Sequence, residues 1–186
     1  DETPALLRGL FALMDAHPAD ARKVLSRLGR LLRTTLDRTE RDKVPLEQEL
    51  DHIRDYLDIE SIRFRDRLRV TWDVPTALLG ANVPSMVLQP LVENSIKHGP
   101  DATNDRVEIT VRGERRGDRL TLRVEDNGKG CADTDRALVN GGIGLRNVGE
   151  RMRLLYGEGG SLTITSPGGR GFIAAVSIPL EQETEG

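Results

Sequence analysis

The sequence DNGKG, residues 126–130, directly follows TLRVE (121–125), in which apolar and polar residues alternate as in a β-strand. Asp126, at the end of that strand, can present two acceptor oxygens to a ligand. Gly128 and Gly130 remove side chains where the backbone must approach a ligand closely or adopt a positive φ. Asp-Asn-Gly is also an ordinary turn sequence, so the pentapeptide alone is weak evidence for a site. The stretches before and after it decide between the two interpretations.

The stretch LVENSIKHG, residues 91–99, precedes it and has the pattern of an amphipathic helix. Its polar residues fall on one stripe of such a helix, and apolar residues fall on the other side. The polar stripe comprises Glu93, Asn94, Lys97 and His98, and the apolar side comprises Leu88, Leu91, Val92 and Ile96. Oxygen ligands suit a hard cation, and an ammonium group suits phosphate. The stretch therefore predicts a helix that packs on a sheet and faces a magnesium-bound polyphosphate.

The stretch GGIGLRNVGERMRLLYG, residues 141–157, follows DNGKG and places three glycines before an amphipathic helix. The apolar side of that helix is marked by Leu145, Val148, Met152 and Leu155. A glycine loop that opens a helix presents free N–H groups and a positive dipole end to an anion. Taken alone, it can equally be a flexible connection. The three stretches in this order favour a phosphate-binding site over coincidence.

The order of the three stretches resembles the asparagine box and the two glycine boxes of Bergerat-fold ATPases. Those proteins include histidine kinases, DNA gyrase, heat-shock chaperones and mismatch-repair ATPases. The flanking sequences VPLEQELDHIRDYLDIESIRFRDRL (44–68) and VPSMVLQPLVENSIKHG (83–99) closely resemble LytS-like sensor histidine kinases. The likeness extends from about residue 44 to residue 180, which is most of the chain.

The resemblance implies a role for each of the central residues. Asp126 would accept a hydrogen bond from the adenine amino group of ATP, and Gly128 and Gly130 would shape the pocket beneath the base. Asn94 would be the protein ligand for Mg²⁺. Glu93 would orient or activate the attacking nucleophile, as a carboxylate within reach of the γ-phosphate can.

The resemblance also implies further contacts with ATP from the second and third stretches. Gly142 and Gly144 would let the backbone approach the phosphates, with Ile143 and Leu145 beside them in the same loop. Phosphate or lid contacts are expected from four polar residues, each of which can equally be a solvated helix residue: Lys97, His98, Arg146 and Asn147.

The composition is that of a globular protein with a core of aliphatic side chains. Of the 186 residues, 37% are hydrophobic and 3% aromatic, and the net charge of −3 argues against nucleic-acid binding. Cys131 is the single cysteine, which excludes an intramolecular disulfide. No apolar run approaches the ~20 residues of a membrane span, so we expect no membrane contact from this segment. A start at Asp1 suggests a piece of a larger sensor, with this catalytic part in the cytoplasm.

The first forty residues read as two helices, at 4–16 and at about 19–39. In the second, apolar residues at Ala21, Leu25, Leu28 and Leu32 alternate spacings of four and three and form a narrow seam. That seam fits an intrachain hairpin or a helix of a second chain. The family resemblance implies dimerisation helices and hence a homodimer. We therefore expect a helical dimerisation region at 1–66 and an ATP-binding catalytic domain at 67–186.

The remaining chain predicts an α+β fold with helices on one face of a mixed, mostly antiparallel sheet. A helix is expected from Pro45 to about Phe64, with His52 as a surface or helix-packing residue, and another at 144–156. Residues 131–141 are expected to form a short lid. The expected strands are 69–74, 107–114, 119–126, 161–166 and 172–179.

Three classes of function fit these motifs. The first is the ATP-binding kinase portion of a two-component sensor histidine kinase, with ATP, Mg²⁺ and a response regulator as its partners. The second is a Bergerat-fold ATPase or a serine kinase of the anti-sigma type, against which the helical segment at 4–64 argues. The third is a nucleotide-binding pseudokinase scaffold.

The phosphoacceptor histidine is missing from the expected place. LytS-like kinases carry it in a proline-histidine-phenylalanine motif on the first dimerisation helix, and this chain has no such motif. Its histidines are His17, His52 and His98, and none is expected in line with a γ-phosphate. The acceptor is either truncated away or naturally absent. We therefore expect this chain to bind ATP without forming stable phosphohistidine by itself.

Overall fold

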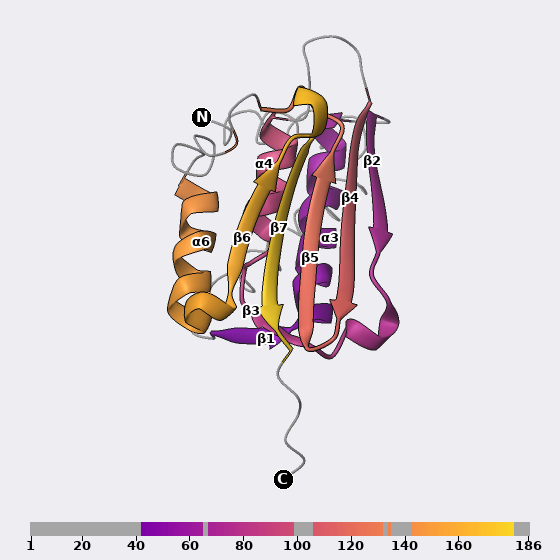
Figure 1. The fold of residues 1–186 in the computed structure, drawn as a ribbon. Helices are drawn as coiled ribbons and strands as arrows, with labels where there is room; N and C mark the ends of the chain where they lie inside the picture. The colour runs from indigo at the N-terminus through magenta and orange to yellow at the C-terminus, as the bar shows by residue number, and fades with distance from the viewer. Residues whose placement is uncertain (1–41, 65–66, 99–105, 132–133, 135–142, 181–186) are drawn as a thin grey trace.

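A computed structural model describes residues 42–64, 67–98, 106–131, 134 and 143–180. These residues form two layers, a five-stranded sheet and a set of helices on one of its faces (Figure 1). The elements follow the chain in this order: β1 (Lys43–Pro45), α3 (Leu46–Phe64), β2 (Leu68–Asp73), β3 (Asn82–Pro84), α4 (Gln89–His98), β4 (Val107–Arg116), β5 (Arg119–Asp126), α6 (Ile143–Tyr156), β6 (Ser161–Thr165) and β7 (Phe172–Pro179).

The main sheet has the strand order β2-β4-β5-β7-β6, so β5 occupies its centre. Strands β2 and β4 pair in parallel, and the other three pairs are antiparallel. Asp126, the last residue of β5, lies in register with Ile109 of β4 and with Phe172 of β7. The predicted α+β fold with a mostly antiparallel sheet is confirmed.

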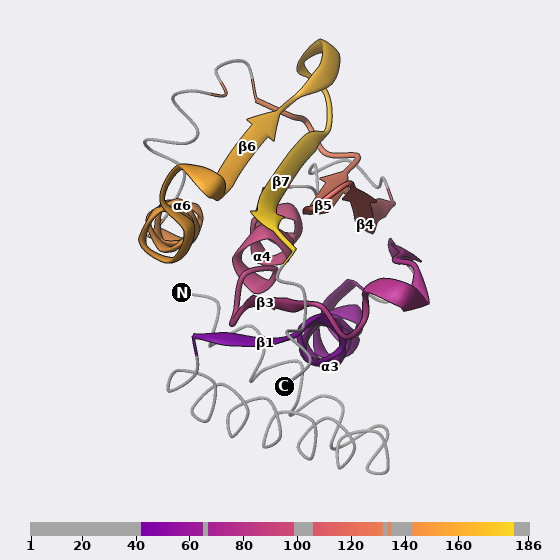
Figure 2. The same ribbon diagram turned by 60° about the horizontal axis from the view of Figure 1, so that its bottom comes forward.

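The alternation in the strands puts one apolar face of the sheet against the helices. In β5 the buried residues are Leu120, Leu122 and Val124, and β4 and β7 alternate in the same way. Each helix adds a buried stripe, such as Leu88, Leu91, Val92 and Ile96 around α4. Figure 2 shows α3, α4 and α6 on the same side of the sheet. One continuous hydrophobic core therefore lies between the two layers.

The short strand β1 was not predicted. It pairs with β3 in an antiparallel two-stranded sheet, in which Val44 lies opposite Val83 and both are buried. Together with α3, it contributes to the same core as the main sheet. Residues on both sides of the predicted division between 66 and 67 therefore contribute to one core. The helices predicted at 4–16 and 19–39 lie outside the described residues.

Other predicted boundaries differ only slightly. The β4–β5 hairpin is tighter than expected, because β4 continues to Arg116 while β5 begins at Arg119 as predicted, which leaves a two-residue turn. Gly117 in this turn has a φ of +62°, which glycine adopts at low cost. Most of the predicted lid at 131–141 lies outside the described residues. Within the described part of the chain, no helix combines the length and apolar character needed to cross a bilayer.

Candidate functional site

The DNGKG loop leaves the sheet at the end of its central strand. The half-buried Asp126 ends β5, and its Oδ1 accepts a hydrogen bond of 2.9 Å from the N–H of Gly128. Gly128 is buried, and Gly130 has a φ of +70°. The loop therefore turns back on the aspartate and holds its carboxylate in a defined orientation. Of the two reasons expected for glycines in this loop, close approach to a ligand or a positive φ, the second applies at Gly130.

The side chain of Asn127 fastens one side of this loop to the start of β4. Its Oδ1 accepts from the N–H of Glu108 at 2.9 Å, and its Nδ2 donates to the carbonyl of Arg106 at 2.8 Å. The backbone N–H of Asn127 also donates to the carbonyl of Glu108, at 3.3 Å. The amide in Asp-Asn-Gly thus supports the loop and does not face a ligand.

Gly171 supports the other side of the loop, and sequence reasoning missed it. Its N–H donates to the carbonyl of Gly128 at 2.7 Å, and its φ is +65°. A Cβ at this position would lie 2.6 Å from the carbonyl oxygen of Asp126. Ser166 joins the two segments, because its Oγ donates to the carbonyl of Gly171 and accepts from the N–H of Cys131. The available signal was the glycine-rich sequence PGGRG (167–171) between β6 and β7.

Helix α4 presents the predicted polar stripe as far as the structure describes it. Glu93 and Asn94 are half-buried, and Lys97 is exposed, opposite the buried apolar side of the helix. Glu93 Oε1 accepts a hydrogen bond of 2.7 Å from Nε2 of Gln89, one turn earlier. The side chain of His98 lies outside the described residues. The helix as a whole contacts β5, which ends at Asp126, and α6, which follows the third motif.

The first turn of α6 combines packing residues with exposed ones. Gly144 lies close to α4, since a Cβ there would be 3.3 Å from Cβ of Pro90. The side chain of Leu145 is 3% exposed and belongs to the core, whereas that of Ile143 is 73% exposed. Arg146 and Asn147 are exposed, and Gly142 lies outside the described residues. The described geometry thus gives Gly144 a packing role, and it leaves Leu145 only backbone groups to offer a ligand.

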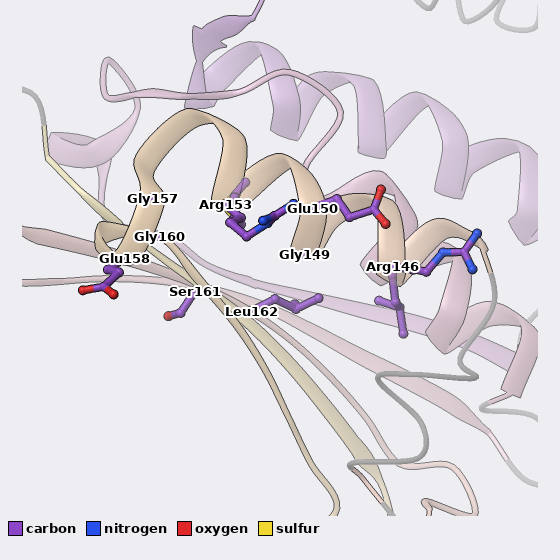
Figure 3. Close-up of a pocket in the computed structure, with 11 residues that line it drawn as sticks. Arg146, Gly149, Glu150, Arg153, Gly157, Glu158, Gly160, Ser161 and Leu162 are labelled. Atoms are coloured by element: carbon purple, nitrogen blue, oxygen red, sulfur yellow. The ribbon is translucent and has the colours of Figure 1, made fainter.

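A separate groove of about 640 Å³ lies between α6 and β6 (Figure 3). Arg146, Glu150 and Arg153 line it from α6, and Leu162 lines it from β6. None of Asp126, Glu93 or Asn94 is among its lining residues. Arg146, for which we predicted a phosphate or lid contact, borders this groove.

No group of three or more His, Cys, Asp or Glu side chains that could hold a metal occurs within the described residues. A cation beside Asn94 would therefore depend on oxygens from a bound ligand and from water. Mg²⁺ is commonly held in this way, by one or two protein ligands together with substrate phosphates and water. The amide of Asn94 fits such a site, because it offers a neutral oxygen on the exposed side of α4.

Two family models match the chain. The model described as histidine kinase matches residues 6–68. The model described as histidine kinase-, DNA gyrase B- and HSP90-like ATPase matches residues 82–182, which is more than half of the chain.

Individual proteins agree with these matches. The chain is 34% identical to the sensor protein LytS of Enterococcus faecalis over 185 residues, covering 94% of this chain and 31% of LytS. It is 33% identical to the sensor histidine kinase YpdA of Escherichia coli, covering 87% of this chain and 30% of YpdA. The chain thus spans about a third of the length of these relatives.

A solved structure gives the same fold. The histidine kinase domain from the blue-light activated histidine kinase of Erythrobacter litoralis EL346 superposes with a TM-score of 0.60 at 21% identity. The match covers 97% of this chain and 94% of that domain. This chain belongs to the histidine kinase-, DNA gyrase B- and HSP90-like ATPase family, and it is similar to the sensor histidine kinases LytS and YpdA over about a third of their length.

Proposed function

We propose that this chain binds ATP with Mg²⁺ and transfers the γ-phosphate to a histidine, from which a response regulator receives it. The observation that carries the proposal is the DNGKG loop, which is fastened on both sides at the end of the central strand. Helix α4, with Glu93 and Asn94 on its polar stripe, contacts that strand. A carboxylate in a fixed loop, together with an amide and a second carboxylate on a helix that contacts the same strand, suits a nucleotide with its metal.

Asp126 would recognise the adenine base. The hydrogen bond from Gly128 to Oδ1 fixes the carboxylate but leaves acceptor capacity, since a carboxylate has about four lone-pair sites. The adenine amino group would donate to this carboxylate. Gly128 and Gly130 carry no side chains that could fill the space beside the base. Loop rigidity matters here, because a fixed acceptor loses little entropy when the base binds.

The phosphates would lie along α4 and the start of α6. Asn94 would hold Mg²⁺, which when bound neutralises charge on the transferring phosphate. Glu93 would orient the attacking nucleophile, and the exposed Lys97 offers a cation to the phosphate oxygens. The backbone N–H groups of Gly144 and Leu145, in the first turn of α6, are suitable donors to an anion.

In this proposal, none of the three histidines of this chain is the phosphoacceptor. His52 is 4% exposed and hydrogen-bonded to Gln89, so its ring is not accessible to a γ-phosphate. The proposal retains a homodimer through the predicted N-terminal helices. It also retains a cytoplasmic location for the catalytic part, where ATP is available.

The test uses the full-length sensor kinase and ATP radiolabelled on its γ-phosphate. Acid-labile, base-stable label on the kinase, absent from an Asn94→Ala variant, is the expected result. Released phosphate or phosphoserine on a partner protein would instead indicate an ATPase or a serine kinase. Nucleotide binding without any transfer would indicate a pseudokinase scaffold. Any of these last outcomes would overturn the proposed phosphotransfer to histidine.

A further inference from the structure

Helix α3 carries three buried polar side chains, Glu49, His52 and Glu60, and the first two make hydrogen bonds to the segment that starts α4. Glu49 is 0% exposed and His52 is 4% exposed, and the two are one helical turn apart. Burying such groups costs free energy unless hydrogen bonds compensate it. Both side chains bond to the segment that starts α4, next to α3 in the helical layer (Figure 2).

Glu49 fixes the backbone at the point where α4 begins. Its Oε1 accepts from the N–H of Met86 at 2.7 Å, and its Oε2 accepts from the N–H of Leu88 at 3.3 Å. Met86 has a φ of +58°, the one positive φ of a non-glycine residue in the described ranges. A carboxylate at this end of α4 also suits the positive pole of the helix dipole. Glu49 therefore holds the backbone that leads into the helix.

His52 is linked by hydrogen bonds to two side chains of α4. Its Nε2 lies 2.8 Å from Oε1 of Gln89, and Nε2 of Gln89 lies 2.7 Å from Oε1 of Glu93. The donor and acceptor in each of these hydrogen bonds follow from Glu93, the last residue of the series. A carboxylate of Glu93 can only accept, so the amide nitrogen of Gln89 faces it and the amide oxygen faces His52. The ring nitrogen Nε2 of His52 must therefore carry the hydrogen.

We propose that His52 is a positioning residue for Glu93, acting through Gln89. The half-buried Glu93 can adopt several rotamers on the surface of α4. Only some of them would direct its carboxylate towards the attacking nucleophile. The hydrogen bond from Gln89 selects among them, and the buried ring of His52 holds Gln89 in the rotamer that makes this bond. This inference rests on the proposed role of Glu93 in phosphoryl transfer.

The inference predicts a specific separation of effects. Misplacing Glu93 should slow transfer, because a catalytic group works only in a narrow range of positions. ATP affinity should change little, because Asp126 and its loop are held by Asn127 and Gly171 and not by α3. A purely structural role for His52 would lower stability without this selective loss of rate.

The test compares His52→Gln with His52→Met in the full-length kinase. The two side chains have the same length, but only glutamine can place an N–H donor near the position of ring Nε2. His52→Met should lower the rate of transfer roughly tenfold or more, as expected for a lost hydrogen bond to a charged network, with ATP affinity within about twofold. His52→Gln should restore much of that rate. Urea unfolding of each variant measures stability separately.

A second set of variants tests the coupling. Gln89→Met should cause a similar loss of rate, and the double variant with His52→Met should be no slower than the slower single one. Additive losses would mean that the two residues do not act through one chain of hydrogen bonds. Nitrogen NMR of the imidazole should show a protonated Nε2 whose signal changes in Gln89→Met. An unprotonated Nε2 would overturn the inference even if a variant folds poorly.

Glu93→Gln separates this inference from the proposed function. If Glu93→Gln is slow and His52→Met is as fast as the wild type, the inference fails and the role of Glu93 stands. If Glu93→Gln transfers phosphate at the wild-type rate, the role assigned to Glu93 fails and the inference fails with it. Slow transfer in both variants, together with recovery in His52→Gln, supports both.

Discussion

Replacing Gly171 by alanine should displace the DNGKG loop, although Gly171 itself lies outside that loop. Gly171 lies between β6 and β7 and contributes no side chain to the predicted site. Its N–H nevertheless donates to the carbonyl of Gly128, and its φ is +65°. The added Cβ would lie 2.6 Å from the carbonyl oxygen of Asp126. A backbone oxygen cannot rotate away as a side-chain end can, so the loop itself has to move.

The cost of Gly171→Ala has two parts. An alanine in the left-handed region costs about 1–2 kcal/mol. Relieving the contact with the oxygen of Asp126 adds about 1–3 kcal/mol, as overpacking of a well-packed site does. The expected loss in the free energy of unfolding is therefore roughly 2–5 kcal/mol.

Gly168→Ala is the matched control for Gly171→Ala. Gly168 lies in the same turn with a φ of +62°, and nothing lies within 4 Å of an added Cβ. Its free energy of unfolding should fall only by the cost of placing alanine in the left-handed region, about 1–2 kcal/mol. The difference between the two variants thus isolates the contact with the DNGKG loop.

Two measurements on both variants test this reasoning. Urea unfolding gives the two losses of stability, and calorimetry gives the affinity for ATP. We expect Gly171→Ala to bind ATP more weakly because Asp126 shifts, and Gly168→Ala to bind as the wild type does. Equal losses of stability in the two variants, or unchanged ATP affinity in Gly171→Ala, would refute the idea that Gly171 supports the site.

Three further predictions follow from the site and the helices. Asp126→Asn should weaken ATP binding by about 1.5–3 kcal/mol, because the adenine amino group loses a charged acceptor; equal calorimetric affinities would remove Asp126 from the site. Glu49→Gln should lower the free energy of unfolding by about 1–3 kcal/mol, since an amide nitrogen would face a backbone N–H. The exposed Glu47→Gln is its control, with a change within about 0.5 kcal/mol, and equal effects in urea unfolding would contradict the role of Glu49. Light scattering on a chain that begins near Val44 should give a monomer, and a surviving dimer would locate the interface outside the N-terminal helices.

The features that the sequence predicted well depend on local periodicity. Strand β5 alternates strictly, so its inward residues and the position of Asp126 at its end could be read without knowledge of its neighbours. The apolar side of α4 likewise follows from helical spacing, and Glu93 and Asn94 lie opposite that side as predicted. A period of two or 3.6 residues is a property of the segment itself. Sheet order and register add only the position of β5 at the centre.

The supporting residues were missed because their partners are far away in sequence. Glu49 reads as an ordinary acidic residue in the first turn of a helix, yet it bonds to the backbone of Met86, 37 residues later. His52 was predicted to be a surface or helix-packing residue, and the second alternative holds, but its partner Gln89 is also 37 residues away and was not predicted. No local pattern marks such a pair. Only the packing of α3 beside α4 turns these side chains inward.

The same separation matters for the predicted boundary at residue 66, because α3 precedes that boundary and packs with residues that follow it. The histidine kinase model matches residues 6–68 as one stretch, and α3 lies inside it. Its apolar residues Leu50, Ile53 and Leu57 nevertheless belong to the core beneath the sheet. A match along the chain records the order of segments, whereas a domain is defined by the surfaces that bury one another. Helix α3 therefore continues the matched N-terminal segment and also holds the start of α4, which carries Glu93.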